Sequence, residues 1–154
     1  MALDDDIALL ARQPLLSLME RDALRLLAFA AESRILRAGD VLFRVGEPSD
    51  GAVLVISGAV ALDSREDGQP AQEIVGPGAL IGETALFAAV ARPVTAIARE
   101  PTQVMRLSRS VMRRVLAESP ASAEAIAAAV AQRLQGFVGQ LTAVQEALTA
   151  LERG

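Results

Sequence analysis

Three residues near the middle of the chain have the types and spacing that suit an anionic ligand carrying a hydroxyl group. Gly82 and Glu83 are followed, nine residues after the glutamate, by Arg92. An arginine can donate two charge-assisted hydrogen bonds to a phosphate, a glycine lets backbone approach it closely, and a helix N-terminus after Gly82 would add N–H groups. A carboxylate beside an anion needs a donor of its own, such as a sugar hydroxyl. Together the three residues fit a ribose phosphate, although the spacing alone fits equally a turn, an exposed glutamate and a surface arginine.

The composition excludes most catalytic and metal chemistry. The 154 residues include no cysteine and no histidine, and all 15 basic residues are arginine. Cysteine or histidine zinc sites, haem ligation by these residues, and Ser-His or Cys-His catalysis are excluded, as is a phosphate-binding lysine. Glu83 beside Arg92 would stay ionised, which suits binding better than proton transfer. We therefore expect no catalytic residue, no metal site and no enzymatic activity.

The charge balance bears on partners and location. The net charge is -4 at pH 7, whereas DNA-binding domains carry a basic surface. A small cluster of Arg106, Arg109, Arg113 and Arg114 is interpreted as a solvated helix face, because no aromatic residues alternate with it. No apolar run reaches the roughly 18 residues of a membrane span, and the N-terminus MALDDDIALL is acidic where a signal peptide is basic. We expect a cytoplasmic protein with no membrane contact and no DNA binding by this chain.

Two residue patterns, one helical and one of short strands, predict the elements that must position Glu83 and Arg92. The first thirty residues are helical in pattern, and from Arg34 the chain breaks into short β-branched segments separated by glycine turns. The expected strands cover residues 35–37, 41–45, 52–57, 59–63, 73–75, 94–99 and 104–107. Such a pattern is typical of an antiparallel barrel or jelly roll. The run Val53-Leu54-Val55-Ile56 is apolar throughout, which predicts burial on both faces of that strand.

The residue pattern becomes helical again after Ser108. A helix over about 111–118, capped by Ser108 or Ser110, is followed by a last helix over about 121–153. Its apolar stripe has steps of 3, 4, 3, 4 and 3 residues from Leu134 to Leu151, which is heptad spacing. We expect residues 1–120 to form one unit and 121–154 a helix that pairs with a second copy, the alternative being a frayed helix on its own domain.

Residues from about 15 to 140 resemble a cyclic nucleotide-binding domain. The resemblance is carried, in the family's order, by RAGDVLFRVGE at 37–47, AVLVISGAV at 52–60 and GETALFAAVAR at 82–92. Within the family the pattern is most similar to the sensor half of the catabolite activator protein, whose last helix also begins near a proline and carries the run seen here as Arg133-Leu134-Gln135. The resemblance implies a β-roll flanked by helices, with a long C-terminal helix that closes over the ligand and dimerises.

The resemblance also implies roles for particular residues. Glu83 would accept from the ribose 2′-OH, and Arg92 would pair with the cyclic phosphate. Phe137 on the last helix would either stack on the base or, given its place in the heptad stripe, belong to the core or the dimer seam. The other pocket residues implied are Gly82, Thr84, Ala85, Pro93 and Val94. The ligand would be cAMP or cGMP, with no obligatory cofactor, and binding would shift the population of states towards one with the last helix repacked. The output would pass to a downstream protein that the sequence does not identify.

Three features depart from the family pattern. Pro93 has no N–H, so one phosphate hydrogen bond is lost at a cost of about 0.5–3 kcal/mol. Phe137 and Val138 stand where hydroxyl groups read adenine in the catabolite activator protein. No helix-turn-helix follows the last helix, so we expect either a stand-alone sensor or a fragment. The rival interpretation is a dimeric interaction protein of the same fold that has lost nucleotide binding or binds another anion.

Overall fold

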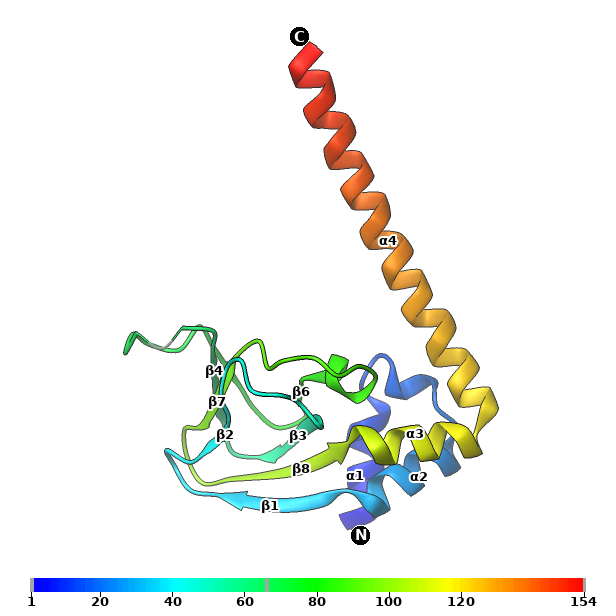
Figure 1. The fold of residues 1–154 in the computed structure, drawn as a ribbon. Helices are drawn as coiled ribbons and strands as arrows, with labels where there is room; N and C mark the ends of the chain where they lie inside the picture. Colours follow the sequence, from blue (N-terminus) through cyan, green and yellow to red (C-terminus); the bar gives the residue numbers. More distant parts are fainter. Residues whose placement is uncertain (1, 66, 154) are drawn as a thin grey trace.

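The computed structural model describes residues 2–65 and 67–153, and Figure 1 shows two antiparallel sheets with helices at one end. The strands are β1 (Glu32–Leu36), β2 (Val41–Phe43), β3 (Gly51–Ser57), β4 (Val60–Asp63), β5 (Glu73–Val75), β6 (Leu80–Ile81), β7 (Thr95–Ala98) and β8 (Thr102–Ser108). The strand order is β1-β8-β3-β6 in one sheet and β2-β7-β4-β5 in the other. The predicted fold class, an antiparallel β-roll with flanking helices, is confirmed.

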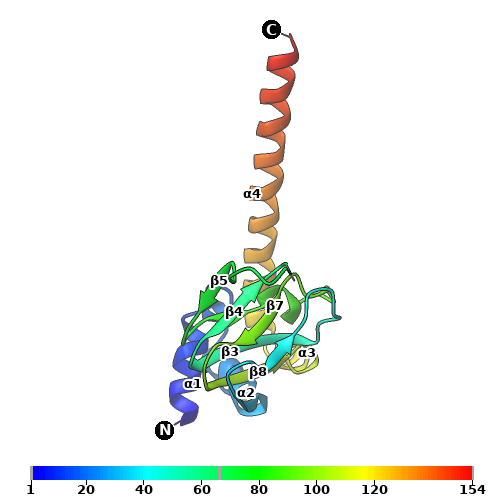
Figure 2. The ribbon, with the colours of Figure 1, turned by 90° about the vertical axis from the view of Figure 1, so that its left-hand side faces the viewer.

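The helices precede and follow the strands, with one short turn between them. They are α1 (Ala2–Ala11), the 3-10 turn η1 (Leu16–Leu18), α2 (Arg21–Ala30), the 3-10 turn η2 (Glu83–Leu86), α3 (Arg109–Glu118) and α4 (Pro120–Arg153). In Figure 2 the helices α1, α2 and α3 gather at the base of the roll, and α4 rises away from it. In the described residues no helix is both long enough and apolar enough to cross a membrane.

Strand β3 is buried on both faces, as its continuous apolar run predicts. Val53 and Val55 belong to the core between the two sheets, where Val60, Ala96 and Val104 are also buried. Leu54 points the other way and packs in a second core with the helices. Since successive side chains of a strand alternate between its faces, one apolar strand supports both cores.

The second core fixes the helices against the roll. It contains Leu10 of α1, Leu27 of α2 and Met112 of α3, each with no exposed surface. Helix α3 begins where β8 ends, and the Ser108 hydroxyl caps it by accepting a hydrogen bond from the Val111 N–H at 3.0 Å. The predicted cap is therefore the first of the two serines considered. The roll and the start of α3 are thus joined without a loop.

Most strands differ from their predicted bounds by one or two residues at an end, and β1 and β6 differ most. Strand β1 begins at Glu32 and not at residue 35. It is an edge strand whose first three residues, Glu32, Ser33 and Arg34, are polar and face solvent, so no apolar residue marks its start. Strand β6 was not predicted, since two residues beside a glycine turn give no periodicity. It pairs Leu80 and Ile81 with β3 and leads directly into Gly82.

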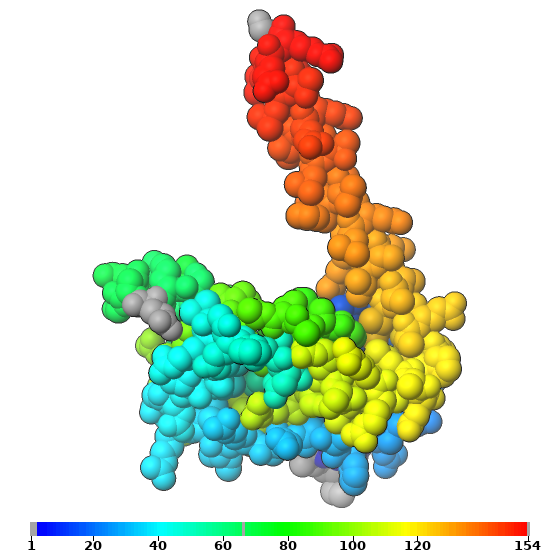
Figure 3. Space-filling view, viewed as in Figure 1, coloured from blue at the N-terminus to red at the C-terminus, as the bar shows by residue number. Residues whose placement is uncertain are grey.

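Helix α4 has 34 residues, a length of about 50 Å. Only Ser122 and Ile126, both near its start, are buried. The Ser122 hydroxyl accepts from the Glu20 N–H at 2.8 Å and so ties the base of α4 to the start of α2. Val130 still packs partly against the second core, whereas residues 131–153 are exposed, and Figure 3 shows the far part of the helix rising away from the roll.

Candidate functional site

Arg92 is positioned by two backbone hydrogen bonds with the loop that follows β2. Its N–H donates to the Glu47 carbonyl and its carbonyl accepts from the Gly46 N–H, both at 2.8 Å. These two hydrogen bonds fix the backbone of Arg92 and therefore the direction in which its side chain leaves the backbone. That direction is into the molecule, because Arg92 is only 6% exposed.

The Arg92 guanidinium lies between an aromatic ring and a carboxylate. Its central carbon is 4.2 Å from the centroid of the Phe43 ring, a cation–π contact. Its Nη2 atom lies 3.5 Å from the Asp50 Oδ1 atom, and the Asp50 Oδ2 atom lies 3.4 Å from Arg106. Burial lowers the pKa of Arg92 from its ordinary value and the charge of Asp50 opposes that shift. The ordinary value is so high that the group stays cationic.

The second terminal nitrogen of Arg92 has no partner. Within the described residues its Nη1 atom is buried and makes no hydrogen bond. Leaving a buried polar group unsatisfied costs about 1–3 kcal/mol and more for a charged one. A hydrogen-bond acceptor placed beside this atom would therefore be favourable, and an anionic acceptor most of all.

Gly82 lies directly against this nitrogen. A Cβ atom added to Gly82 would lie 2.8 Å from Arg92 Nη1, and Gly82 has a φ of +77°, in the left-handed region. The absence of a side chain therefore serves both the backbone conformation and the contact. The structure brings together the two ends of the 82–92 segment, as the sequence prediction requires.

Glu83 begins η2 and contacts α4. Its Oε1 atom accepts from Arg133 Nη1 at 3.1 Å, and the Glu83 side chain is 24% exposed. Arg133 was noted in the sequence only as part of the Arg-Leu-Gln run and was given no role. Its position shows that the long helix reaches the 82–92 segment through one ion pair.

The remaining predicted site residues differ in their surroundings. Ala85 is buried, and its N–H donates to the Gly82 carbonyl at 2.9 Å, whereas Thr84 and Pro93 are exposed. Val94 packs against the core between the sheets. Phe137 is 58% exposed on α4.

A small cavity adjoins Arg92 on the side of Asp50. It has a volume of about 250 Å³ and its lining includes Phe43, Asp50, Val53, Arg92 and Arg106. Sequence reasoning missed Phe43 and Asp50, which were assigned only to a strand and a turn. No local signal marks them, since each acquires its contact with Arg92 through the tertiary fold.

The arrangement brings together the chemical groups that an anion with a hydroxyl group requires. It offers a buried guanidinium with an unsatisfied N–H edge, a glycine that permits close approach, and a carboxylate at the next residue for a hydroxyl group. Asp50 pairs with both Arg92 and Arg106. One negative charge faces two positive charges, so the net charge of the three side chains is positive.

Comparison with known proteins gives a consistent result. The sequence model of one family, described as "Cyclic nucleotide-binding domain", matches residues 33–119, more than half of the chain. A cyclic nucleotide-binding-like protein from Brucella abortus is 43% identical, with a TM-score of 0.69 over 73% of this chain and 98% of that one. The catabolite activator protein of Thermus thermophilus is 27% identical, with a TM-score of 0.64 over 86% of this chain and 63% of that one.

Curated relatives are much longer than this chain. A cyclic nucleotide-gated potassium channel of Mesorhizobium japonicum is 32% identical over 95 residues, which are 62% of this chain and 25% of the channel. The chain spans between 7% and 31% of the length of the curated relatives that it matches.

Proposed function

This chain belongs to the cyclic nucleotide-binding domain family, and on that basis we propose that it is a regulatory module that binds cAMP or cGMP and catalyses no reaction. The observation that carries the proposal is the buried Arg92 Nη1 atom, which has no partner in the described residues and lies beside Gly82. A cyclic phosphate oxygen at this nitrogen would satisfy the guanidinium. A charge-assisted hydrogen bond of that kind is roughly twice as strong as a neutral one.

Glu83 supplies the second half of the proposed recognition. A nucleotide whose phosphate meets Arg92 would place its ribose beside the residue next to Gly82, and the Glu83 carboxylate would accept from the 2′-OH. One Glu83 oxygen is held by Arg133, but a carboxylate has about four acceptor positions. Arg133 therefore orients Glu83 without using up its capacity.

We further propose that residues 121–154 form a dimerisation and lid helix on the sensor unit of residues 1–120. The apolar stripe from Leu134 to Leu151 is between 49% and 77% exposed, and its heptad spacing fits a second copy of the same helix. Phe137 lies in this stripe, where it could meet either a base or the partner helix. The module would act in the cytoplasm on a downstream protein and not on DNA, since the chain has a net charge of -4.

A second candidate function is the binding of a smaller anion. The cavity beside Arg92, at about 250 Å³, is smaller than the roughly 300–1,000 Å³ of usual ligand pockets. Arg92 and Arg106 both line it, so a sulfate or phosphate ion would also fit the charges. In that case the chain would be a dimeric interaction protein with an inorganic ion in its roll.

A melting experiment separates the two candidates. The purified chain is heated with millimolar cAMP, cGMP, 5′-AMP, sulfate or inorganic phosphate. A ligand at 100 times its dissociation constant adds about 2.7 kcal/mol, which for a chain of this size raises Tm by roughly 5–10 °C. We expect this rise with a cyclic nucleotide and not with 5′-AMP. A rise with sulfate and phosphate alone would favour the second candidate.

The variant Arg92→Met completes the experiment. It should remove the response to cyclic nucleotide, while Arg44→Met, which alters an exposed arginine on the adjoining loop, should keep it. An unchanged response in Arg92→Met would remove Arg92 from the binding site.

A further inference from the structure

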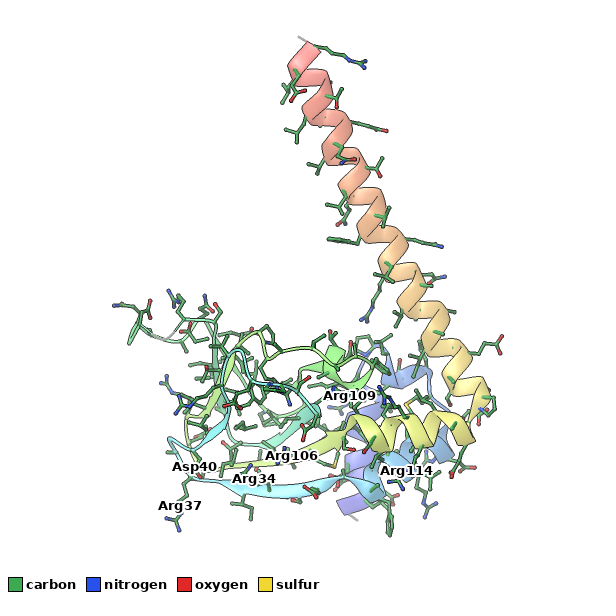
Figure 4. The ribbon with its side chains drawn as sticks, viewed as in Figure 1. Arg34, Arg37, Asp40, Arg106, Arg109 and Arg114 are labelled. Atoms are coloured by element: carbon green, nitrogen blue, oxygen red, sulfur yellow. The ribbon has the colours of Figure 1, made fainter. Side chains whose placement is uncertain are left out.

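Arg109, the first residue of α3, joins segments that lie far apart in the sequence. Its guanidinium donates to the carbonyl of Ser49, in the loop before β3, with Nη2 at 2.6 Å and Nη1 at 3.2 Å. Its Nη1 atom also donates to the carbonyl of Ala85, in η2, at 3.2 Å and to that of Ala88, just after η2, at 3.1 Å. Figure 4 shows Arg109 where the start of α3 meets this turn. The expectation that Arg109 belongs to a solvated helix face is therefore wrong.

The acceptors around the Nη1 atom of Arg109 outnumber the hydrogens that this atom carries. Its Nη1 atom carries two hydrogens, yet four oxygen atoms lie within 3.5 Å of it: the carbonyl and hydroxyl oxygens of Ser49 and the carbonyls of Ala85 and Ala88. The loop and η2 thus compete for the same donor. A small movement of η2 would shift the balance without breaking the whole contact.

Arg109 also holds the residue that pairs with Arg92. The Arg109 N–H donates to the Asp50 carbonyl at 2.7 Å, and the Asp50 carboxylate lies 3.5 Å from Arg92 Nη2. The backbone of Arg109 therefore positions Asp50, while its side chain positions the end of η2. Both contacts meet at the residue from which α3 begins, and α4 follows α3 after a single residue, Ser119.

We propose that Arg109 is a positioning residue that couples the ligand site to α3 and α4. A ligand that draws Gly82 and Glu83 towards Arg92 also moves the carbonyls of Ala85 and Ala88. The Nη1 hydrogens of Arg109 follow those carbonyls and leave Ser49, and the start of α3 turns with them. The coupling rests on the proposed function, whereas the static contact of Arg109 with η2 does not.

Hydrogen exchange tests the static contact without any ligand. The variants are Arg109→Gln and Arg109→Lys, with Arg113→Gln as the control, because Arg113 is an exposed arginine of the same helix. We expect Arg109→Gln to speed exchange of the backbone amides of residues 85–89 about tenfold. Arg109→Lys should give a smaller increase, since one ammonium replaces a two-nitrogen fork, and Arg113→Gln should stay within twofold of the parent chain. Equal exchange in all four proteins would overturn the contact.

A second measurement tests the coupling. In saturating cAMP or cGMP, the parent chain should show a ligand-dependent change of exchange over residues 109–133. Arg109→Gln should bind the cyclic nucleotide about tenfold more weakly. Even at saturation it should lose the ligand-dependent change of exchange over residues 109–133, a result that a purely structural role of Arg109 would not produce. If Arg109→Gln binds and transmits the change like the parent chain, the coupling is wrong. If the parent chain binds neither nucleotide, the proposed function and the coupling fail together, and the exchange result without ligand still decides the static contact.

Discussion

Arg92 occupies space that only a glycine at position 82 leaves open, since a Cβ atom there would lie 2.8 Å from Arg92 Nη1. The buried cation and the left-handed turn are therefore parts of one arrangement. A substitution at position 82 alters the backbone turn, and a substitution at position 92 removes the cation. The two substitutions therefore test the proposed ligand site independently.

The first prediction concerns Gly82→Ala. A non-glycine residue in the left-handed region costs roughly 1–2 kcal/mol, and the added methyl group would also displace Arg92. We expect a loss of stability of that size, together with at least tenfold weaker cyclic nucleotide binding by calorimetry. Gly39→Ala is the matched control, because Gly39 has a φ of +90° with nothing within 4 Å of an added Cβ. It should lose similar stability and keep its affinity; equal affinity losses would argue against the Gly82 contact.

The second prediction concerns the ligand-free stability of Arg92→Met. Removing a buried charge whose Nη1 atom lacks a partner relieves an unsatisfied group, whose cost is about 1–3 kcal/mol. The loss of the contact with Phe43, worth about 0.5–2 kcal/mol, works in the opposite direction. We expect urea denaturation without ligand to give a free energy of unfolding at least equal to that of the parent chain. A loss above about 2 kcal/mol would show that Arg92 is a structural residue.

The third prediction concerns Pro93→Ala. Pro93 is exposed and directly follows Arg92, and alanine would restore an N–H at the position where a phosphate is expected. One additional hydrogen bond of about 1 kcal/mol corresponds to roughly fivefold tighter binding. Calorimetry with cAMP and cGMP measures the gain. Pro101→Ala, in an exposed turn, should leave the affinity unchanged, and weaker binding by Pro93→Ala would contradict the proposal.

The fourth prediction concerns assembly through α4. Leu141 is 49% exposed and lies in the heptad stripe, so Leu141→Glu should bring charge into a helix pair and dissociate it. Sedimentation should give twice the chain mass of 16.1 kDa for the parent and the monomer mass for Leu141→Glu. Gln140→Glu adds the same charge one residue earlier and should remain dimeric. A monomeric parent at high micromolar concentration would refute the dimer.

The fifth prediction concerns pH. Partial burial, with a smaller effect of Asp5, raises the pKa of Asp6 in α1. A carboxyl whose pKa is higher in the folded chain opposes folding once it is ionised, and this cost is absent below the unfolded pKa of about 3.9. Asp6→Asn should therefore raise Tm at pH 7, and the gain should shrink as the pH falls through the raised pKa. Asp4→Asn, which alters an exposed carboxylate of the same helix, serves as the control.

The parts of the fold that depend on neighbouring residues could be predicted from the sequence. The apolar run of β3 predicted a strand buried on both faces, and Val53 and Leu54 do lie in different cores. The turn at Gly82 and the Ser108 cap of α3 could be predicted for the same reason, because each depends on residues next to it in the sequence. Strand β6 was missed because two residues are too few to show a period.

The site was only half predictable for a related reason. Gly82, Glu83 and Arg92 lie in one segment and could be read together. Asp50 lies 42 residues from Arg92, and Arg109 lies 24 residues from Ala85, so their contacts exist only once the strand register is set. A charged residue in a turn gives no sign of a partner that distant.

Helix α4 has a mechanical consequence that follows from its anchoring. Its buried residues lie near its start, and the helix continues for most of its roughly 50 Å beyond them. A rotation of about 10° at that base would carry the far end through roughly 9 Å. If the proposed coupling through Arg109 turns the start of α3, the helix acts as a lever arm, because a small change of angle at its base becomes a much larger displacement at its far end.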